Sequence, residues 1–138
     1  MSPENRRANI AEEWRKSVEA RRAAEALLTL GLWNDALNRG YYAAYHAACA
    51  VLLTDGLEAR SHEGVISLFG QHFALTGKLP RNAGRDLHDL KEVREHADYR
   101  RGFEATEVEA RREIARAGGI CEAAAAYLAA GGWLAPAG

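Results

Sequence analysis

Apolar residues along this chain recur at intervals of three and four positions, which is the spacing of one face of an α-helix. Between positions 61 and 76 the apolar set includes Val65, Leu68, Phe69 and Phe73, which a helix places on one side. No run rich in β-branched side chains alternates apolar and polar residues as a half-buried strand does. The pattern predicts an all-α protein.

Capping residues and glycines divide this pattern into five helices. Ser2 can cap the first helix, with Pro3 at its first position, and Gly31 can end it. Thr106 and Glu109 have the spacing of a capping box at the start of the last helix. The predicted helices cover residues 3–30, 35–54, 61–76, 81–99 and 107–130. Short connections favour antiparallel neighbours, and therefore an up-and-down bundle of four or five helices.

The second predicted helix is apolar on nearly every side. Its polar side chains form one line, Arg39, Tyr42 and His46, at spacings of three and four residues. A helix that is apolar on several faces is enclosed, either by its own bundle or by a second subunit. The sequence therefore favours a homodimer as much as deep burial within one chain.

Length and composition suit one globular domain. We expect that domain to span all 138 residues, 1–138, with 131–138 as a loose tail. Apolar residues make up 48% of the chain and charged residues 27%, which is typical of a folded protein. The formal net charge of −1 excludes a basic field over the whole surface, so any RNA contact has to be local.

The sequence shows no metal or cofactor motif. Cys49 and Cys121 lack the paired spacing of a zinc site or a disulfide framework, and we expect both to be buried thiols. We therefore predict no metal and no cofactor. The N-terminal residues are polar, and no run approaches the ~20 apolar residues of a membrane span. These features predict a cytoplasmic protein without membrane contact.

The fourth predicted helix carries an arginine beside its apolar stripe. Leu87 and Leu90 belong to that stripe, and Arg94 follows them by seven and four residues. Asp98 lies one turn further along and can pair with Arg94. One interpretation is a structural ion pair, worth roughly a few tenths of a kcal/mol if it is exposed. The other is a guanidinium that Asp98 orients toward a phosphate.

Several short motifs add to this arginine. They are the runs Arg39–Ala48, Ser61–Gly64, Phe69–Phe73, Leu79–Pro80 and Arg94–Tyr99. Together they resemble the HEPN (higher eukaryotes and prokaryotes nucleotide-binding) domain family, over residues 34–99 or about half of the chain. The resemblance implies an up-and-down helical bundle, often dimeric and frequently encoded beside a minimal nucleotidyltransferase. It also implies toxin-like activity, because many members are metal-independent ribonucleases or toxins of toxin–antitoxin pairs.

The ribonucleases of this family resemble one another in an arginine followed, four to six residues later, by histidine. Attack of a ribose 2′-OH on its phosphate needs a base, an acid and a cation for the developing charge. Arg94 matches the arginine, but Tyr99 occupies the histidine position. Tyrosine has a reference pKa of ~10 and is a poor base at neutral pH. His46 can stand in if the second helix packs beside the end of the fourth; otherwise it is a hydrogen-bonded packing residue.

The motifs define two sets of candidate site residues. The catalytic candidates are Arg94, Asp98, Tyr99 and His46, and the candidates for nucleotide or RNA binding are Arg39, Tyr42, Ser61 and His62. For the binding set there are structural alternatives: Tyr42 as a core or interface aromatic, Ser61 as a helix cap, and His62 as a partly exposed first-turn residue. Tyr99, near a helix end, is also a candidate for modification by a partner nucleotidyltransferase.

These residues support three functional hypotheses. One is a metal-independent, toxin-like endoribonuclease that uses Arg94. Another is a nucleotide- or RNA-associated component of a two-gene system, partnered by a nucleotidyltransferase, with weak or no catalysis. A third is a non-catalytic dimerisation module. The tyrosine at position 99 shifts the prediction toward the second hypothesis.

Overall fold

The computed structural model describes residues 1–134, and within them all regular structure is helical. The helices are α1 (Pro3–Thr29), α2 (Trp33–Thr54), α3 (His62–Phe69), α4 (Ala83–Tyr99) and α5 (Glu107–Ala130), and a π-helical turn η1 (Gly70–Ala74) follows α3. The predicted all-α class is confirmed.

Local signals in the sequence set most of the helix ends. The hydroxyls of Ser2 and Ser61 each accept the backbone N–H three residues further on, at 3.1 and 2.9 Å. Thr106 and Glu109 form the predicted capping box at the start of α5. Gly31, with φ of +73°, follows α1 in the left-handed conformation that glycine tolerates. The predicted caps are confirmed.

The third helix differs from its prediction. Its α-helical part ends at Phe69, and η1 continues the chain to Ala74 with a wider turn, which the bond from Leu75 N–H to the Gly70 carbonyl closes at 2.9 Å. The start of α4 comes very close to η1, because a Cβ on Gly84 would lie 3.1 Å from the Cα of Gly70. One wide turn hardly alters the spacing of apolar residues, so the sequence pattern predicted a single helix through both parts.

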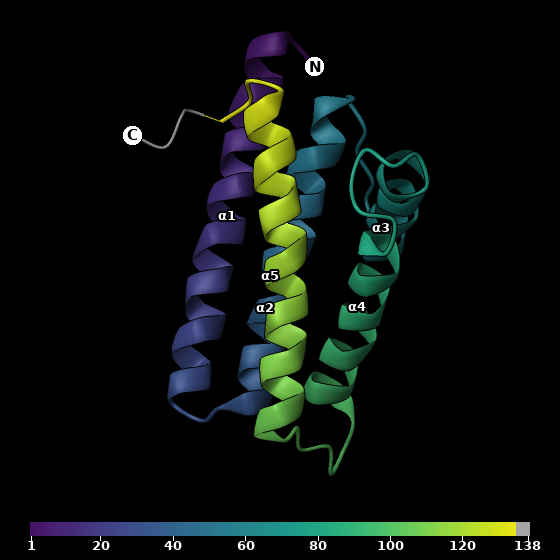
Figure 1. Cartoon of the computed structure of the whole chain (residues 1–138). Coiled ribbons are helices and arrows are strands. Elements are labelled where there is room, and N and C mark those ends of the chain that lie inside the picture. Colours follow the sequence, from purple (N-terminus) through teal and green to yellow (C-terminus); the bar gives the residue numbers. More distant parts are fainter. Residues whose placement is uncertain (135–138) are drawn as a thin grey trace.

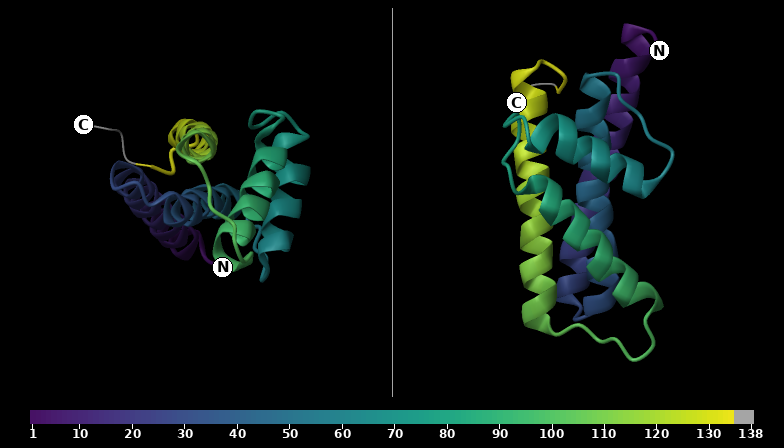
Figure 2. Two further views of the ribbon diagram at one scale, coloured as in Figure 1. Left: turned by 90° about the horizontal axis from the view of Figure 1, so that it is seen from below. Right: turned by 90° about the vertical axis from the view of Figure 1, so that its right-hand side faces the viewer.

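The helices run alternately up and down (Figure 1). Helices α1, α2 and α5 lie side by side, and α4 runs along the other side of α2, while α3 crosses near the far end (Figure 2). Helix α2 contacts each of the other four helices. Its apolar faces are thus covered within one chain, which is one of the two arrangements that its composition predicts.

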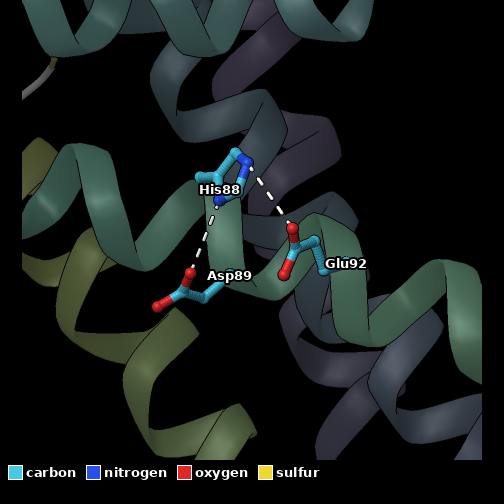
Figure 3. Close-up of side chains that lie close together, drawn as sticks. All are labelled: His88, Asp89 and Glu92. Carbon is cyan, nitrogen blue, oxygen red and sulfur yellow. Dashed lines mark hydrogen bonds and ion pairs between the residues drawn. The ribbon is translucent and has the colours of Figure 1, made fainter.

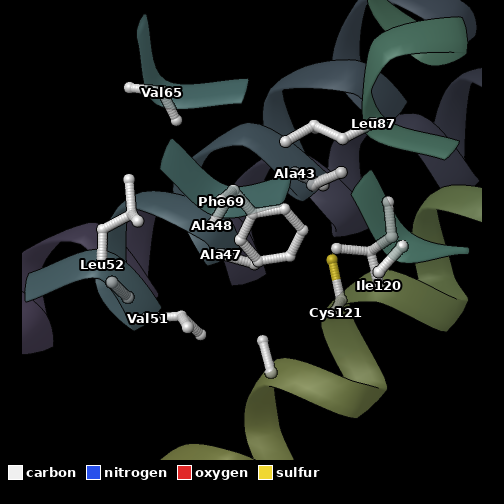
Figure 4. Packing of buried hydrophobic residues seen from close by; sticks show 14 of the residues in the cluster. Ala43, Ala47, Ala48, Val51, Leu52, Val65, Phe69, Leu87, Ile120 and Cys121 are labelled. Carbon is white, nitrogen blue, oxygen red and sulfur yellow. The ribbon is translucent and has the colours of Figure 1, made fainter. Parts of the chain in front are cut away.

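The core forms where α3, α4 and α5 pack against the alanines of α2. Phe69 is 1% exposed and lies among side chains of all three neighbouring helices (Figure 4). Its neighbours in that view include Ala47, Ala48, Leu87, Ile120 and Cys121. Burying a phenylalanine of this kind contributes roughly 1.5–3 kcal/mol. Cys121 is buried as predicted, and Cys49 is partly buried.

The two ends of the described chain meet at one end of the bundle (Figure 1). Arg7 donates to the carbonyl of Gly132 at 3.0 Å and lies over the ring of Trp133. The first part of the predicted loose tail is therefore held against α1, and residues 135–138 lie outside the described residues. Within residues 1–134, no helix has the length and apolar character needed to cross a bilayer.

Candidate functional site

Arg94 lies near the end of α4 with its guanidinium turned into the protein. Only 10% of its side chain is exposed. The guanidinium carbon lies 5.3 Å from the ring centre of Tyr41, 5.5 Å from that of Tyr42 and 5.9 Å from that of Tyr99. These are cation–π distances, and guanidinium groups are well suited to them because they are planar and weakly hydrated. Three tyrosines thus surround one cation.

One carboxylate orients this cation. Arg94 Nη1 donates to Asp98 Oδ2 at 3.3 Å, and the Asn38 side-chain amide donates to the same oxygen at 2.9 Å. Asn38 Oδ1 in turn accepts from Arg39 Nε at 2.9 Å. The chain of hydrogen bonds connects the end of α4 to α2 and fixes Asp98, whose side chain is 23% exposed. Asp98 lies where the sequence predicted it, one turn after Arg94.

One N–H of Arg94 remains without a partner. Its Nε is buried and makes no hydrogen bond within residues 1–134. Two other buried side-chain atoms of these residues also lack a hydrogen bond, Nε of Arg6 and Oε2 of Glu113, although Glu113 forms ion pairs with Arg112 at 3.3 Å and with Arg116 at 3.4 Å. A buried unpaired donor costs about 1–3 kcal/mol. The unpaired Nε of Arg94 therefore costs stability, as the other two atoms do, and of the three residues only Arg94 is one that the sequence predicted for the site.

His62, the first residue of α3, lies against the same tyrosines. Its Nδ1 is 2.8 Å from the Tyr41 hydroxyl, and its ring stacks on Tyr45 with 4.3 Å between centres and 13° between planes. Tyr42 meets the imidazole edge-on at 5.8 Å. Burial lowers the pKa of His62, and the positive charge of Arg94 lowers it further. The structure thus places a histidine from another helix beside Arg94.

His46 makes its hydrogen bond elsewhere. Its Nδ1 lies 2.7 Å from Oε2 of Glu13 on α1, and both side chains are mostly buried. The pair lines a pocket of about 510 Å³ whose floor includes Leu52, Leu53 and Val65. The structure thus gives His46 a partner on α1, as the packing alternative expects.

We call the residues around the cation the Arg94 cluster. Its members are Arg94, Asp98, Tyr99, Asn38, Arg39, Tyr41, Tyr42 and His62. Of the eight residues predicted from the sequence, Arg94, Asp98, Tyr99, Arg39, Tyr42 and His62 come together in it. Ser61 caps α3 immediately before His62, and His46 pairs with Glu13. Tyr99 is 74% exposed and forms the outer edge of the cluster.

Sequence reasoning missed Tyr41, Asn38 and a third polar residue, Lys91. The Lys91 side chain is 15% exposed and joins α4 to α3 through Glu95 at 2.6 Å and Glu63 at 3.4 Å. Lys91 precedes Arg94 by three residues and Asn38 precedes Tyr41 by three, so both lie one turn from a cluster residue. This spacing of one helical turn is the feature of the sequence from which Lys91 and Asn38 could have been predicted.

A separate polar group lies on the exposed side of α4. Ligand atoms of His88, Asp89 and Glu92 are within 4.8 Å of one another (Figure 3). The two imidazole nitrogens face different carboxylates, at 3.5 and 3.7 Å, and Asp89 also lies 3.7 Å from Arg116. Neighbouring charges on α4, together with Arg116 of α5, account for this arrangement.

Comparison with known proteins identifies the class of this bundle. The sequence profile of the HEPN domain matches residues 11–127, and the chain therefore belongs to the HEPN domain family. The match extends the resemblance seen over residues 34–99 into α1 and α5.

Individual relatives agree with this assignment. A UPF0332 protein of Thermotoga maritima is 32% identical over 120 residues, which is 86% of this chain and 91% of the relative. A UPF0332 protein of Gloeobacter violaceus is 39% identical over 84 residues, or 61% of this chain and 67% of the relative. A protein of Methanocaldococcus jannaschii named "Putative toxin MJ0605" is 40% identical over 77 residues, or 56% of this chain and 58% of the relative.

Proposed function

We propose that this HEPN protein is toxin-like and binds a phosphate of RNA or of a nucleotide at Arg94. It belongs to a two-gene system whose other product is a minimal nucleotidyltransferase, and it cleaves RNA weakly or not at all. The observation that carries this proposal is the Arg94 guanidinium, buried among three tyrosines with its Nε unpaired. The toxin name of a relative supports the same class of function.

The energetics support a ligand for Arg94. A buried ion pair is often no more stabilising than well-packed apolar residues of the same size, because both charges lose their hydration. Here a single carboxylate faces the guanidinium at 3.3 Å, and that carboxylate also accepts from Asn38. A guanidinium can donate several hydrogen bonds in one plane and matches phosphate oxygens well. Because Nε of Arg94 is buried, an incoming phosphate would use this unpaired donor only after the side chains around it shift.

Tyr99 supports weak or absent cleavage, since it takes the position of the histidine in the ribonuclease motif. Its exposed side chain also supports a second role in the same system. A partner nucleotidyltransferase can reach its hydroxyl and transfer a nucleotide to it, with pyrophosphate as the leaving group. Mass spectrometry of the protein after incubation with the partner and ATP tests this, and an unchanged Tyr99 peptide argues against it.

One observation favours active cleavage as the alternative. His62 brings an imidazole to the tyrosines that surround Arg94. Imidazole is the usual proton-transfer group of metal-independent phosphodiester cleavage. The second candidate function is therefore a metal-independent endoribonuclease that uses Arg94.

Binding and cleavage can be separated with one pair of variants. Fluorescence anisotropy with labelled single-stranded RNA is measured for the wild type, for Arg94→Ala and for Arg101→Ala, an exposed arginine just beyond α4. We expect Arg94→Ala to abolish binding while Arg101→Ala retains it. Equal binding by both variants would overturn the proposal. RNA cleavage in EDTA that depends on Arg94 would favour the alternative function.

The partners are tested with the unmodified protein. Co-purification with the product of a neighbouring nucleotidyltransferase gene supports the two-gene system, and separate elution argues against it. A homodimer also remains a prediction. Light scattering on the purified chain measures its mass, and a monomer at micromolar concentration would contradict a stable dimer.

A further inference from the structure

We propose that His62 and Arg94 together bind one phosphodiester group of a single-stranded nucleic acid, and that His62 does so as a neutral imidazole donating from Nε2. The inference rests on the proposed binding of phosphate at Arg94. It goes further by giving His62, a binding candidate from the sequence, a stated donor atom and protonation state, and by choosing the nucleic-acid backbone over a free nucleotide as the ligand.

The position of His62 is fixed from two sides. The Tyr41 hydroxyl holds Nδ1 at 2.8 Å, and Tyr45 stacks on the ring face at 4.3 Å. Ser61 caps α3 one residue earlier and so fixes the backbone from which the imidazole extends. His62 and Arg94 meet through Tyr41 and Tyr42, since each contacts both of these rings. A ligand group at the edge of these rings can therefore reach both side chains.

The buried hydroxyl of Tyr41 determines which nitrogen of His62 carries the proton. Tyr41 is fully buried, and burial raises the pKa of its phenol, so the hydroxyl keeps its proton. That O–H has His62 Nδ1 as its hydrogen-bond partner. If it donates there, the buried donor is satisfied, and a neutral His62 carries its own proton on Nε2. His62 then presents an N–H to a ligand while its ring has no charge.

The surroundings of His62 favour this neutral form. The charged and titratable groups that face it are Arg94 and Lys91 of α4, His46, Tyr41, Tyr42 and Tyr45 of α2, and Glu63 of its own helix. Burial and the two nearby cations lower its pKa, and the effect of Glu63 in the opposite direction is smaller. The imidazole therefore stays uncharged at neutral pH, and Arg94 supplies the positive charge of the pair.

The charge around the cluster fits a singly charged ligand. Arg94 pairs with Asp98, Lys91 pairs with Glu63 and Glu95, and Arg39 donates to the amide of Asn38, so the three cations stand beside three carboxylates. A nucleoside triphosphate carries several negative charges and needs a clear excess of cations or a metal ion. A phosphodiester carries one negative charge, which one guanidinium and a neutral donor can satisfy. The balance of charge therefore favours the backbone of a nucleic acid.

The aromatic edge of the cluster supports a single strand. Tyr99 is 74% exposed, and its ring lies 5.9 Å from the guanidinium carbon of Arg94. Unstacked bases bind on exposed aromatic rings without strong sequence preference, each contributing about 1–3 kcal/mol. A base next to the bound phosphodiester can stack on Tyr99.

The test uses a labelled single-stranded RNA whose 2′ positions are methylated, so that it binds but cannot be cleaved by its own 2′-OH. Affinity is measured by anisotropy for the wild type, His62→Leu, His62→Gln and His88→Leu. His62→Leu removes the donor, whereas His62→Gln places an amide N–H in the region of Nε2. His88→Leu is the matched control, an exposed histidine of α4 that lies outside the Arg94 cluster.

We expect His62→Leu to weaken binding roughly ten- to hundredfold, as the loss of a hydrogen bond to a charged group does. His62→Gln should stay within roughly threefold of the wild type, and His88→Leu should not differ from it. Circular dichroism and melting curves confirm that each variant is folded. Equal loss in His62→Leu and His62→Gln would show that a donor at this position is not what binds, and would overturn the inference.

Competition with ATP and with inorganic phosphate separates this inference from the proposed function. Displacement of the RNA by unlabelled single strands, but not by either small ligand at millimolar concentration, is the expected result. Displacement by ATP at micromolar concentration would overturn the inference and leave the proposed phosphate site at Arg94 in place. If the wild type binds neither RNA nor nucleotide, the proposed function fails as well.

Discussion

Two histidines of this bundle are held in the same way by different partners. Each uses Nδ1 for a short hydrogen bond, which for His62 goes to the phenol of Tyr41 and for His46 to the carboxylate of Glu13. His62 contacts two tyrosine rings that Arg94 also contacts, and burial and the charge of Arg94 lower the pKa of its imidazole, while His46 lines a pocket that includes several leucines. The two regions lie along the same helix, α2, which contributes aromatic side chains to both.

The difference between the regions lies in which polar groups have partners. The carboxylate of Glu13 and the imidazole of His46 satisfy each other by a hydrogen bond, and this pairing is sufficient to explain why both are buried. Arg94 is surrounded by rings, shares its one carboxylate with Asn38 and keeps a buried Nε without a partner. The Glu13–His46 pair is what packing requires of two buried polar groups. The cation–π contacts and the Asp98 ion pair stabilise the arrangement around Arg94 in part, but they leave one donor unpaired, and perturbed polar groups of this kind are concentrated at functional sites.

The largest expected effect comes from replacing Arg94 with an apolar residue of similar length. We expect Arg94→Met to weaken RNA binding at least roughly a hundredfold, because the cation of the site is lost. We also expect its unfolding free energy to stay within about 1 kcal/mol of the wild type, since the desolvation cost of the guanidinium disappears too. Anisotropy and urea unfolding measure the two effects. A large loss of stability would show that Arg94 is a structural residue like the His46 pair.

The next largest effect concerns the exposed ring of the cluster. Tyr99→Ala should weaken binding of single-stranded RNA roughly five- to fiftyfold through the loss of one stacked base. Tyr99→Phe keeps the ring and should bind like the wild type, which makes it the matched control. Stability should not change in either variant, because the side chain is mostly in solvent. If the two variants bind RNA equally well, bases do not stack at this position.

A smaller effect, on stability alone, is expected in the other region. Glu13→Ala leaves His46 without its partner and should lower the unfolding free energy by about 1 kcal/mol. Glu12→Ala, on the exposed neighbouring position, is the control, and urea unfolding measures both variants. RNA binding should be unchanged in each. Weaker RNA binding by Glu13→Ala would mean that the site extends to the pocket beside His46.

The smallest effect is a dependence of stability on pH. Burial and Arg94 lower the pKa of His62 in the folded state, so the unfolded chain takes up more protons as the pH falls below the reference value of ~6.5. Stability from this source is therefore complete above that pH and declines as the solution is acidified. The hydrogen bond from Lys91 lowers the pKa of Glu95, which adds a separate loss of stability below the usual carboxyl value of 4.5.

This pH dependence is measured by urea unfolding at pH 7.5 and at pH 5.5. The wild type should be less stable at the lower pH, and His62→Gln should show a smaller difference. In Arg94→Met the pKa of His62, followed by its imidazole resonance, should rise, because the second cause of its lowering is removed. An unchanged imidazole titration would contradict the placement of Arg94 beside His62.

The sequence predicted those features that depend on neighbours along the chain. Ser2, Ser61 and the Thr106–Glu109 box are local signals, and each caps the expected helix. The position of Arg94 beside the apolar stripe also follows from spacing within one helix, and its burial agrees with that prediction.

The features that depend on contacts between helices were not predictable in the same way. Spacing shows that Tyr42 and His46 share a face of α2, but not that α1 supplies a carboxylate to His46. It equally does not show that the start of α3 carries His62 to Tyr41, 21 residues away in the chain. Periodicity assigns a face to each residue, whereas the crossing of two helices decides which residues on facing sides meet.

Gly40 links the packing of α2 on α5 to the position of the cluster residues next to it on α2. It lies between Arg39 and Tyr41 on the side that faces α5, where an added Cβ would collide with the side chain of Ile114. The missing side chain lets α2 and α5 pack closely next to Arg39 and Tyr41, two residues of the Arg94 cluster. In Gly40→Ala the new Cβ would displace the end of the Ile114 side chain, and any movement that this side chain does not absorb would shift α2. Close packing of α5 against Gly40 thus contributes to where α2 holds Arg39 and Tyr41.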